Sequence, residues 1–189
     1  MDDKDWRFDR AIDLHAAGDF EGAKEKLVSL LTDDPTDVEA ICALGRCLDD
    51  MDRSDQADAL LDLALKRAPD EVRLMVEVAE RALDAGAPDR AAHILRDALH
   101  IAPTHAGALF LLGNAFFDTG HPAEAVKSYQ LALESDPYHA EAWYNLALAR
   151  TELGEREGTI EAWISYLKCH PESPERAAIE ATIQALARS

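Results

Sequence analysis

The feature that most constrains the fold of this sequence is an internal repeat of 34 residues. Proline recurs at this interval five times, at Pro35, Pro69, Pro103, Pro137 and Pro171. A glycine recurs at the same interval, replaced once by aspartate, at Gly18, Asp52, Gly86, Gly120 and Gly154. A period of this length indicates an array of stacked structural units, each of which buries its apolar face against its neighbours.

Each repeat contains two amphipathic stretches, in which apolar residues recur at steps of three and four. In the fourth repeat these stretches are residues 108–117 and 123–133. The glycine ends the first helix, and the proline after the second helix prevents it from continuing. No segment alternates apolar and polar residues, so we expect antiparallel helix pairs and no strand.

The segments LFLLGNAFF, AEAVKSYQLALESDP and AWYNLALA closely resemble the tetratricopeptide repeat. The resemblance covers essentially the whole chain and implies an all-α, right-handed superhelical solenoid that forms a single domain over residues 1–189. The expected repeats are residues 4–37, 38–71, 72–105, 106–139 and 140–173, all bounds being approximate.

The terminal repeats depart from the family pattern at a few positions. Arg7 and Arg10 stand where later repeats have apolar residues, and Thr159 stands where alanine is expected. After the last repeat, we expect a capping helix at about 174–188, with Ser173 as its N-cap and Pro174 as its first residue.

The triplet Asp118-Thr119-Gly120 is also the form in which an aspartic protease presents its catalytic carboxylate. In the repeat register, however, the triplet aligns with residues 84–86 and 152–154, which are expected to form a helix end and the turn after it. An aspartic protease needs two carboxylates held together by a β-sheet framework, which the sequence does not predict. We therefore interpret Asp118 as non-catalytic.

In tetratricopeptide repeat proteins, the first helices line a concave groove that binds peptides or helices of other proteins. The groove residues that the resemblance implies here are Phe8, Ile12, Cys42, Arg46, Arg73, Val76, Phe110, Asn114, Phe117, Tyr144, Asn145 and Leu148, with Glu77, Glu80 and Glu141 on the same surface. An asparagine amide can donate to and accept from a peptide backbone, and aromatic rings offer rigid apolar area. The alternative is that the aromatic residues pack between repeats.

Four consecutive repeats carry an acidic residue in the last turn of the first helix, at Asp50, Asp84, Asp118 and Glu152. A carboxylate there faces the negative end of the helix dipole, which is unfavourable by ~0.3–1 kcal/mol. We expect these acids to face a ligand along the groove margin. The alternative is that they are solvated turn residues in an acid-rich chain.

The formal net charge is −18, from 37 acidic and 19 basic residues. This balance excludes a general nucleic-acid-binding surface, which needs clustered Lys and Arg, and it favours a basic protein segment as partner. The alternative is that the charge only maintains solubility. The start MDDKDWRFDR does not resemble a secretory signal, and no apolar run approaches the ~20 residues that span a bilayer. We therefore expect a cytoplasmic protein with no direct membrane insertion.

No residue pattern indicates a cofactor, a metal or a catalytic centre. The cysteines at 42, 47 and 169 are odd in number and lack metal-site spacing, and the seven histidines are scattered. No serine, cysteine or lysine stands in a recognisable nucleophile setting. The sequence therefore predicts a protein that is not an enzyme.

One subfamily of the tetratricopeptide repeat binds the C-terminal carboxylate of chaperones through two asparagines and several cations. Asn114 and Asn145 match the asparagines, but Phe110, Glu175 and Ile179 stand where cations are needed. We therefore do not expect an anionic peptide end as ligand.

The sequence thus predicts an interaction module whose groove binds a peptide or helix of a partner protein, as a scaffold, assembly factor or chaperone-like adaptor. The alternative is a self-assembling structural scaffold that docks through its own repeats. Trp6 and Phe8 indicate self-association through the N-terminal repeat, because no earlier repeat is expected to cover them.

Overall fold

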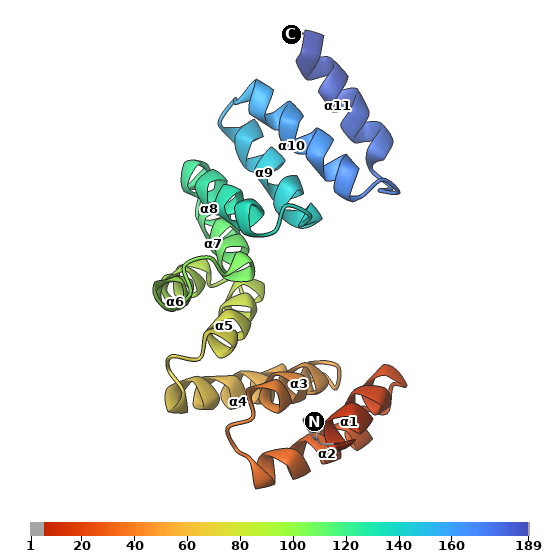
Figure 1. Cartoon of the computed structure of the whole chain (residues 1–189), viewed down its shortest axis with the longest axis vertical. Helices are drawn as coiled ribbons and strands as arrows, with labels where there is room; N and C mark the ends of the chain where they lie inside the picture. The colour runs from red at the N-terminus through yellow and green to blue at the C-terminus, as the bar shows by residue number, and fades with distance from the viewer. Residues whose placement is uncertain (1–5, 189) are drawn as a thin grey trace. The chain divides into compact units, whose positions relative to one another are not determined.

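The computed structural model describes residues 6–188, and within this range it contains helices and no strand (Figure 1). The all-helical prediction is therefore confirmed, while the predicted start of the first repeat, at about residue 4, lies outside the described residues. The helices are α1 (Trp6–Ala16), α2 (Phe20–Asp33), α3 (Val38–Asp49), α4 (Ser54–Arg67), α5 (Val72–Asp84), α6 (Pro88–Ile101), α7 (Ala106–Asp118), α8 (Pro122–Ser135), α9 (Ala140–Glu152), α10 (Arg156–Cys169) and α11 (Arg176–Arg188).

The chain divides into two compact units, with the boundary between Arg81 and Ala82 in α5. We call them the N-terminal unit and the C-terminal unit and describe each by itself. In both, the two helices of a repeat pack together, and the first helices of consecutive repeats also touch, as α1 touches α3 and α7 touches α9. The prediction of one domain over the whole chain stays a prediction.

The turn between the two helices of a repeat requires a left-handed backbone. Gly120 has φ +74°, and the glycines at 18, 86 and 154 are similar. Asp52, which replaces glycine in the second repeat, has φ 58° and is the only non-glycine residue with positive φ in the described range. Aspartate tolerates this conformation better than most residues, which explains why it can stand in for glycine here.

Side chains one repeat apart cap the first helices. His105 and His139 precede α7 and α9, and their Nδ1 atoms accept hydrogen bonds from the backbone N–H of Ala108 and Ala142 at 3.1 and 3.3 Å. Asp37 caps α3 in the same way. These histidines, scattered as they look in the sequence, therefore have a structural role as N-caps.

The core of the C-terminal unit is built around a tyrosine and small residues. Tyr129 is fully buried, and its hydroxyl donates to Asn114 Oδ1 at 2.8 Å. Gly113 backs onto the Tyr129 ring so closely that an added Cβ would overlap it. Fully buried alanines, among them Ala125 and Ala142, let neighbouring helices approach.

Two of the three departures from the family pattern, Arg7 and Thr159, have local explanations. The Arg7 guanidinium donates to Ser29 Oγ at 3.0 Å and pairs with Asp33 at 2.7 Å. Thr159 is buried, and its hydroxyl donates to the carbonyl of Glu155 at 2.9 Å, which satisfies its polar atom.

The capping helix, α11, begins at Arg176, two residues later than predicted. Ser173 still serves this end of the chain, since its Oγ accepts from the Glu175 N–H at 3.3 Å and lies 3.1 Å from the Tyr166 hydroxyl. Ile179 of α11 is buried in the core of the C-terminal unit, so the helix covers the last repeat as expected.

Candidate functional site

The C-terminal unit brings several predicted groove residues together around one hollow of about 530 Å³. We call it the aromatic hollow. Its lining comes from α7, α9 and α10 and includes Phe110, Glu141, Tyr144, Asn145, Tyr166 and His170. Phe110, Tyr144 and Asn145 were predicted from the sequence as partner-binding residues, whereas Tyr166 of α10 and His170, which directly follows α10, were not.

The two predicted asparagines are joined by a hydrogen bond. Asn114 Oδ1 accepts from Asn145 Nδ2 at 2.9 Å and from the Tyr129 hydroxyl at 2.8 Å. Burial raises the pKa of Tyr129 well above its usual value, so the phenol keeps its proton and remains the donor. Asn145 also donates to the Tyr129 side chain, so its Nδ2 has two partners and the group of Asn145 that remains for a ligand is its Oδ1 acceptor.

The aromatic residues of the hollow are held by ring contacts. Tyr144 stands edge-to-face against Trp163 and Tyr166, with ring centroids 5.0 and 5.3 Å apart. Phe110 lies 4.6 Å from the ring of His139. Both Phe110 and Tyr144 are half-buried and pack on the core while also lining the hollow, so the packing role and a surface role coexist in the same side chains.

A nearby carboxylate affects the pKa of Tyr144, one of the aromatic residues of the hollow. Burial first, and then the negative charge of Glu175, raise the pKa of Tyr144. Glu175 is exposed and precedes α11, while Glu141 lies in the first turn of α9. Two carboxylates from different segments therefore accompany the hollow.

The remaining predicted residues of the C-terminal unit lie outside the lining of the hollow. Phe117 and Leu148 are half-buried against the core. Asp84, Asp118 and Glu152 are exposed and are the last residues of α5, α7 and α9. The helix end at Asp118 and the turn at Gly120 are thus confirmed, while a ligand-facing role of the three acids stays a prediction.

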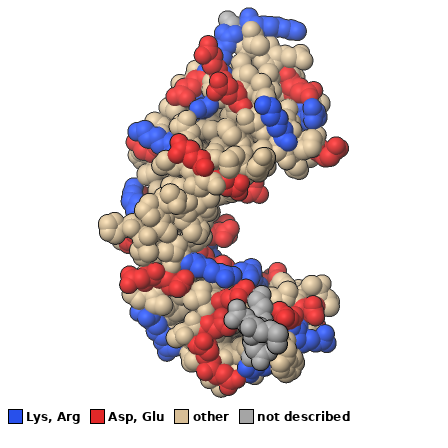
Figure 2. Space-filling model, in the orientation of Figure 1, with Lys and Arg blue, Asp and Glu red and all other residues tan. Residues whose placement is uncertain are grey.

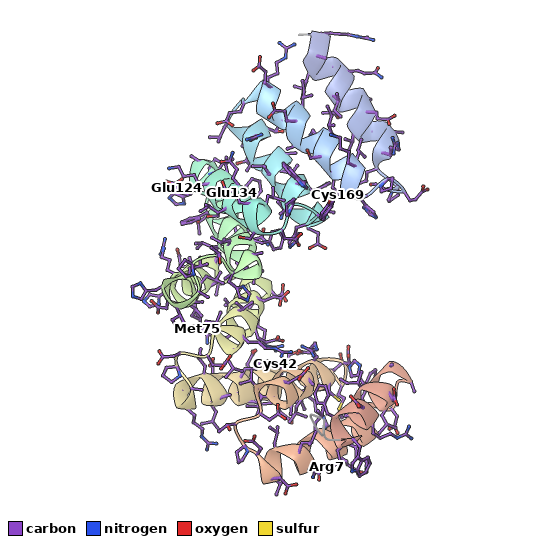
Figure 3. The ribbon with its side chains drawn as sticks, viewed as in Figure 1. Arg7, Cys42, Met75, Glu124, Glu134 and Cys169 are labelled. Carbon is purple, nitrogen blue, oxygen red and sulfur yellow. The ribbon has the colours of Figure 1, made fainter. Side chains whose placement is uncertain are left out.

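In the N-terminal unit, two predicted groove residues form an ion pair and one of the predicted acids contacts a histidine. The Arg46 guanidinium lies 3.7 Å from the Glu77 carboxylate, and the Asp50 carboxylate lies 2.6 Å from His15 Nε2. Cys42 is fully buried, and burial raises the pKa of its thiol to about 11. Cys42 is therefore a core residue and not part of an open surface (Figure 3).

The other candidates of this unit vary in exposure. Phe8 and Val76 are half-buried, and Arg73 is exposed. Trp6 and Ile12 of α1 are 67% and 42% exposed, which leaves apolar area at the surface of the first repeat. On the face drawn in Figure 2, acidic side chains are spread over both units with Lys and Arg between them.

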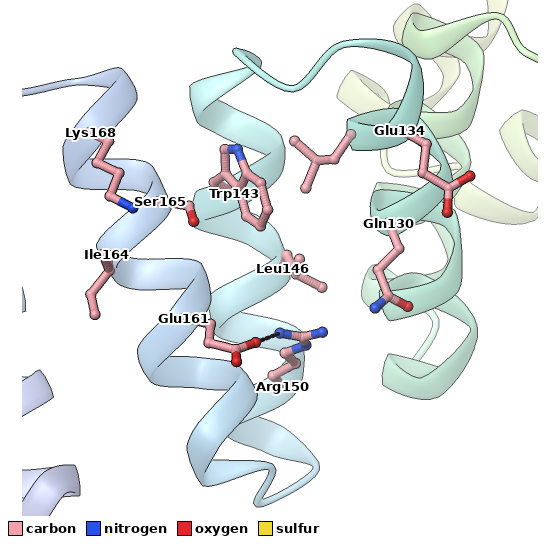
Figure 4. A pocket seen from close by; sticks show the side chains of 10 residues that line it. Gln130, Glu134, Trp143, Leu146, Arg150, Glu161, Ile164, Ser165 and Lys168 are labelled. Carbon is pink, nitrogen blue, oxygen red and sulfur yellow. Dashed lines mark ion pairs between the residues drawn. The ribbon is translucent and has the colours of Figure 1, made fainter.

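A second hollow of the C-terminal unit, of about 510 Å³, was not predicted (Figure 4). It lies between α8, α9 and α10, with Leu133, Trp143 and Leu146 as apolar lining and Gln130, Arg150 and Lys168 among its polar groups. The sequence reasoning considered only one face of the first helices. The signal for this site was Ile164, a 40% exposed apolar residue on a second helix.

This second hollow is held by internal polar contacts. Trp143 Nε1 donates to the carbonyl of Pro137 at 2.9 Å, and an Arg150 amino group donates to the carbonyl of Gly158 at 2.8 Å. The same amino group of Arg150 lies 3.8 Å from the Glu161 carboxylate.

The N-terminal unit has a smaller hollow of about 210 Å³ lined by Leu31, Ile41 and Leu63, which stand three repeats before Leu133, Trp143 and Ser165.

Over residues 6–188, no group of three or more His, Cys, Asp or Glu side chains is arranged to hold a metal ion. In the same range, every helix is too short or too polar to cross a bilayer.

Comparison with known proteins gives the family. Profiles of the tetratricopeptide repeat match residues 14–76, 76–140 and 110–174. The chain belongs to the tetratricopeptide repeat family. A search of curated proteins found no significant match.

Solved structures of other tetratricopeptide repeat proteins have the same fold. PilF of Pseudomonas aeruginosa is similar with a TM-score of 0.85 at 16% identity, over 97% of this chain and 84% of that one. MamA is similar with a TM-score of 0.71 at 20% identity, over 86% and 95% of the two chains. YrrB, described as having an unusual peptide-binding site, gives 0.69 at 19% identity, over 93% and 90%. The predicted all-α tetratricopeptide-like solenoid is therefore confirmed.

Proposed function

We propose that this protein is a non-enzymatic interaction module that binds a segment of a partner protein at the aromatic hollow. The observation that carries the proposal is the meeting of Phe110, Tyr144 and Asn145 around one open hollow of about 530 Å³. Peptide binding by the similar protein YrrB supports the same class of function.

The chemistry of the hollow suits a peptide. Half-buried rings already fixed by their neighbours offer apolar area at little entropic cost, which is typical of residues that dominate protein interfaces. Asn145 Oδ1 can accept a hydrogen bond from a backbone N–H of any sequence. Since Asn145 is positioned by Asn114, the acceptor is held in place before the ligand arrives.

We further propose that the partner segment is basic. The chain carries a net charge of −18, and Asp84, Asp118 and Glu152 add exposed carboxylates at the ends of the first helices in the C-terminal unit. Exposed charges are screened over ~8 Å at physiological ionic strength, so they would increase the rate of encounter more than the final affinity.

Self-assembly is the second candidate, because Trp6 is 67% exposed on α1. If copies dock through the N-terminal repeat, light scattering should show a mass that rises with concentration, and Trp6→Ala should abolish the rise. A constant monomer mass across the concentration series would remove this candidate.

The main proposal is tested by selecting peptides from a displayed random library against the immobilised full chain. The selected peptides are then titrated against wild type, Asn145→Ala and the matched control Gln130→Ala, which changes the second hollow instead. Loss of one uncharged hydrogen bond of ~0.5–1.5 kcal/mol should weaken binding several-fold in Asn145→Ala only. Circular dichroism should show unchanged helix in both variants. Peptides that lose affinity only in Gln130→Ala would contradict the proposal.

A further inference from the structure

The polar groups that the aromatic hollow offers to a ligand are predominantly hydrogen-bond acceptors. Glu141 lines the hollow with a carboxylate, and Asn145 has its Nδ2 engaged with Asn114 and with Tyr129, which leaves Oδ1. The Tyr166 hydroxyl is taken up by contacts with His170 Nδ1 at 3.2 Å and Ser173 Oγ at 3.1 Å. The Tyr144 hydroxyl is engaged with Glu175, and the ring of His170 is a further lining group that can donate. A ligand group that brings donors of its own therefore meets more partners in the hollow than one that brings acceptors.

Apart from His170, which lines the hollow and is charged only when protonated, the charges around the hollow have one sign. Among the described residues that line it, Glu141 is the acid and no lysine or arginine is present. Glu175 stands close enough to Tyr144 for its negative charge to affect that phenol. Glu141 belongs to the start of α9 and Glu175 to the segment before α11, so the carboxylates approach from separate parts of the chain.

The walls of the hollow are aromatic. Phe110 and Tyr144 are half-buried, and Tyr166 completes the lining. The faces of such rings attract cations, and a planar guanidinium also stacks on them. A lysine ammonium is a compact, strongly hydrated charge, whereas a guanidinium is more weakly hydrated and presents five donors in a fork.

We propose that the aromatic hollow receives the side chain of an arginine from the partner segment. The guanidinium packs against the aromatic walls and donates to Glu141, Glu175 and Asn145 Oδ1. This assignment rests on the proposed peptide-binding function and names the residue that the same site selects. It depends on the combination of aromatic walls, acceptors and negative charge, which no other hollow of the C-terminal unit described above shares, since Arg150 and Lys168 line the second one.

The test uses capped single amino acids as probes. N-acetyl-arginine amide, its uncharged isostere N-acetyl-citrulline amide and N-acetyl-lysine amide are titrated at millimolar concentration into the full chain and followed by saturation-transfer NMR. The arginine probe should bind about fivefold or more tightly than the citrulline probe. Glu175→Gln and Glu141→Gln should each reduce this preference. Glu124→Gln, which makes the same charge change at an exposed residue of α8, should leave it unchanged.

The outcomes are distinct. Equal binding of the arginine and citrulline probes, tighter binding of the lysine probe, or an equal loss in Glu124→Gln would each overturn the assignment. Library peptides that need Asn145 but contain no arginine, and that bind Glu175→Gln as wild type, would overturn it while the proposed function stands. If no selected peptide depends on Asn145, the proposed function itself fails, whatever the probes do.

Discussion

The contact between Arg46 and Glu77 in the N-terminal unit stands at the same place in the repeat as the contact between Asn114 and Asn145 in the C-terminal unit. Each residue of the second pair follows its counterpart by two repeats of 34 residues. The first pair is an ion pair with a 3.7 Å separation, and the second is a hydrogen bond of 2.9 Å. The repeat determines which positions of consecutive first helices are in contact. The side chains at these positions determine whether the contact is an ion pair or a hydrogen bond.

The two units also differ at the repeat positions next to these contacts. Cys42 and Val76 of the N-terminal unit correspond to Phe110 and Tyr144 of the C-terminal unit. Cys42 is fully buried, whereas both aromatic residues are half-buried and line a hollow. In consequence the C-terminal unit alone combines aromatic walls with a positioned amide, although both units follow one backbone pattern.

The largest expected effect is on the free energy of unfolding, and it compares two corresponding glycines in the cores of the two units. Gly45 and Gly113 are corresponding residues, but an added Cβ meets Leu61 at an ordinary 3.4 Å in the first case and overlaps the Tyr129 ring in the second. Gly113→Ala should therefore lower the free energy of unfolding by about 1–3 kcal/mol through overpacking. Gly45→Ala should be neutral or stabilise by up to about 1 kcal/mol, because alanine favours helix.

Urea unfolding followed by circular dichroism measures both changes. Combining Gly113→Ala with Tyr129→Leu gives the same alanine–leucine pair as Gly45→Ala with Leu61 and should recover part of the lost stability. Equal effects of the two glycine substitutions would show that Tyr129 does not distinguish the units.

Alkaline pH should act on the N-terminal unit through Cys42. Burial raises the pKa of this thiol to about 11, from an ordinary value of 9.0. The contribution to stability is fully present below about pH 9 and is lost as the pH rises to about 11, which removes about 2–3 kcal/mol. Under reducing conditions, Cys42→Ala should show a shallower loss of unfolding free energy over this range than wild type. Parallel pH profiles would contradict the prediction.

A smaller effect on the free energy of unfolding is expected when the Tyr129–Asn114 hydrogen bond or the Arg46–Glu77 ion pair is removed. Tyr129→Phe removes the hydroxyl that donates to Asn114 and should cost ~0.5–1.5 kcal/mol. Arg46→Ala removes an ion pair whose Arg46 side chain is 51% exposed, so the loss should be at most ~1 kcal/mol and should vanish in high salt. Denaturant titrations at low and high salt compare the two. A salt-sensitive loss in Tyr129→Phe would be inconsistent with a hydrogen bond between neutral groups.

The smallest equilibrium effect is expected from the acids at the helix ends. Changing Asp84, Asp118 and Glu152 to Asn, Asn and Gln should slow association of a selected basic peptide and flatten its dependence on salt, with dissociation altered less. Asp50→Asn is the matched control, because Asp50 is engaged with His15 in the other unit. Stopped-flow measurements decide between the alternatives, and parallel salt curves would leave these acids as solvated turn residues.

Most of the fold could be predicted from the sequence because the repeat determines backbone geometry directly. Gly120 and Asp52 mark left-handed turns, and each repeat proline lies just beyond a helix end. Ser173 and Pro174 gave a helix start two residues early, since Ser173 accepts from Glu175 and bonds to Tyr166 instead of opening the helix directly.

The candidate site was less predictable, because burial and side-chain pairing depend on neighbours outside each repeat. The family resemblance placed Phe110, Tyr144 and Asn145 among the groove residues, and the three line one hollow. The burial of Cys42 could not be predicted, and neither could the approach of Tyr166 from a second helix. The second hollow was not predicted because the candidate site was placed on one face of the first helices, whereas α8 and α10 also line this hollow.

The central claim is that the C-terminal unit, through its aromatic hollow, is the binding part of this protein. Amide chemical-shift mapping of the full chain with a library-selected peptide tests it most directly. We predict that the largest shifts fall on α7, on α9 and on the start of α11, around Phe110, Tyr144 and Asn145. Shifts concentrated in α1 to α4, or around Trp143 and Ile164 in the second hollow, would contradict the account.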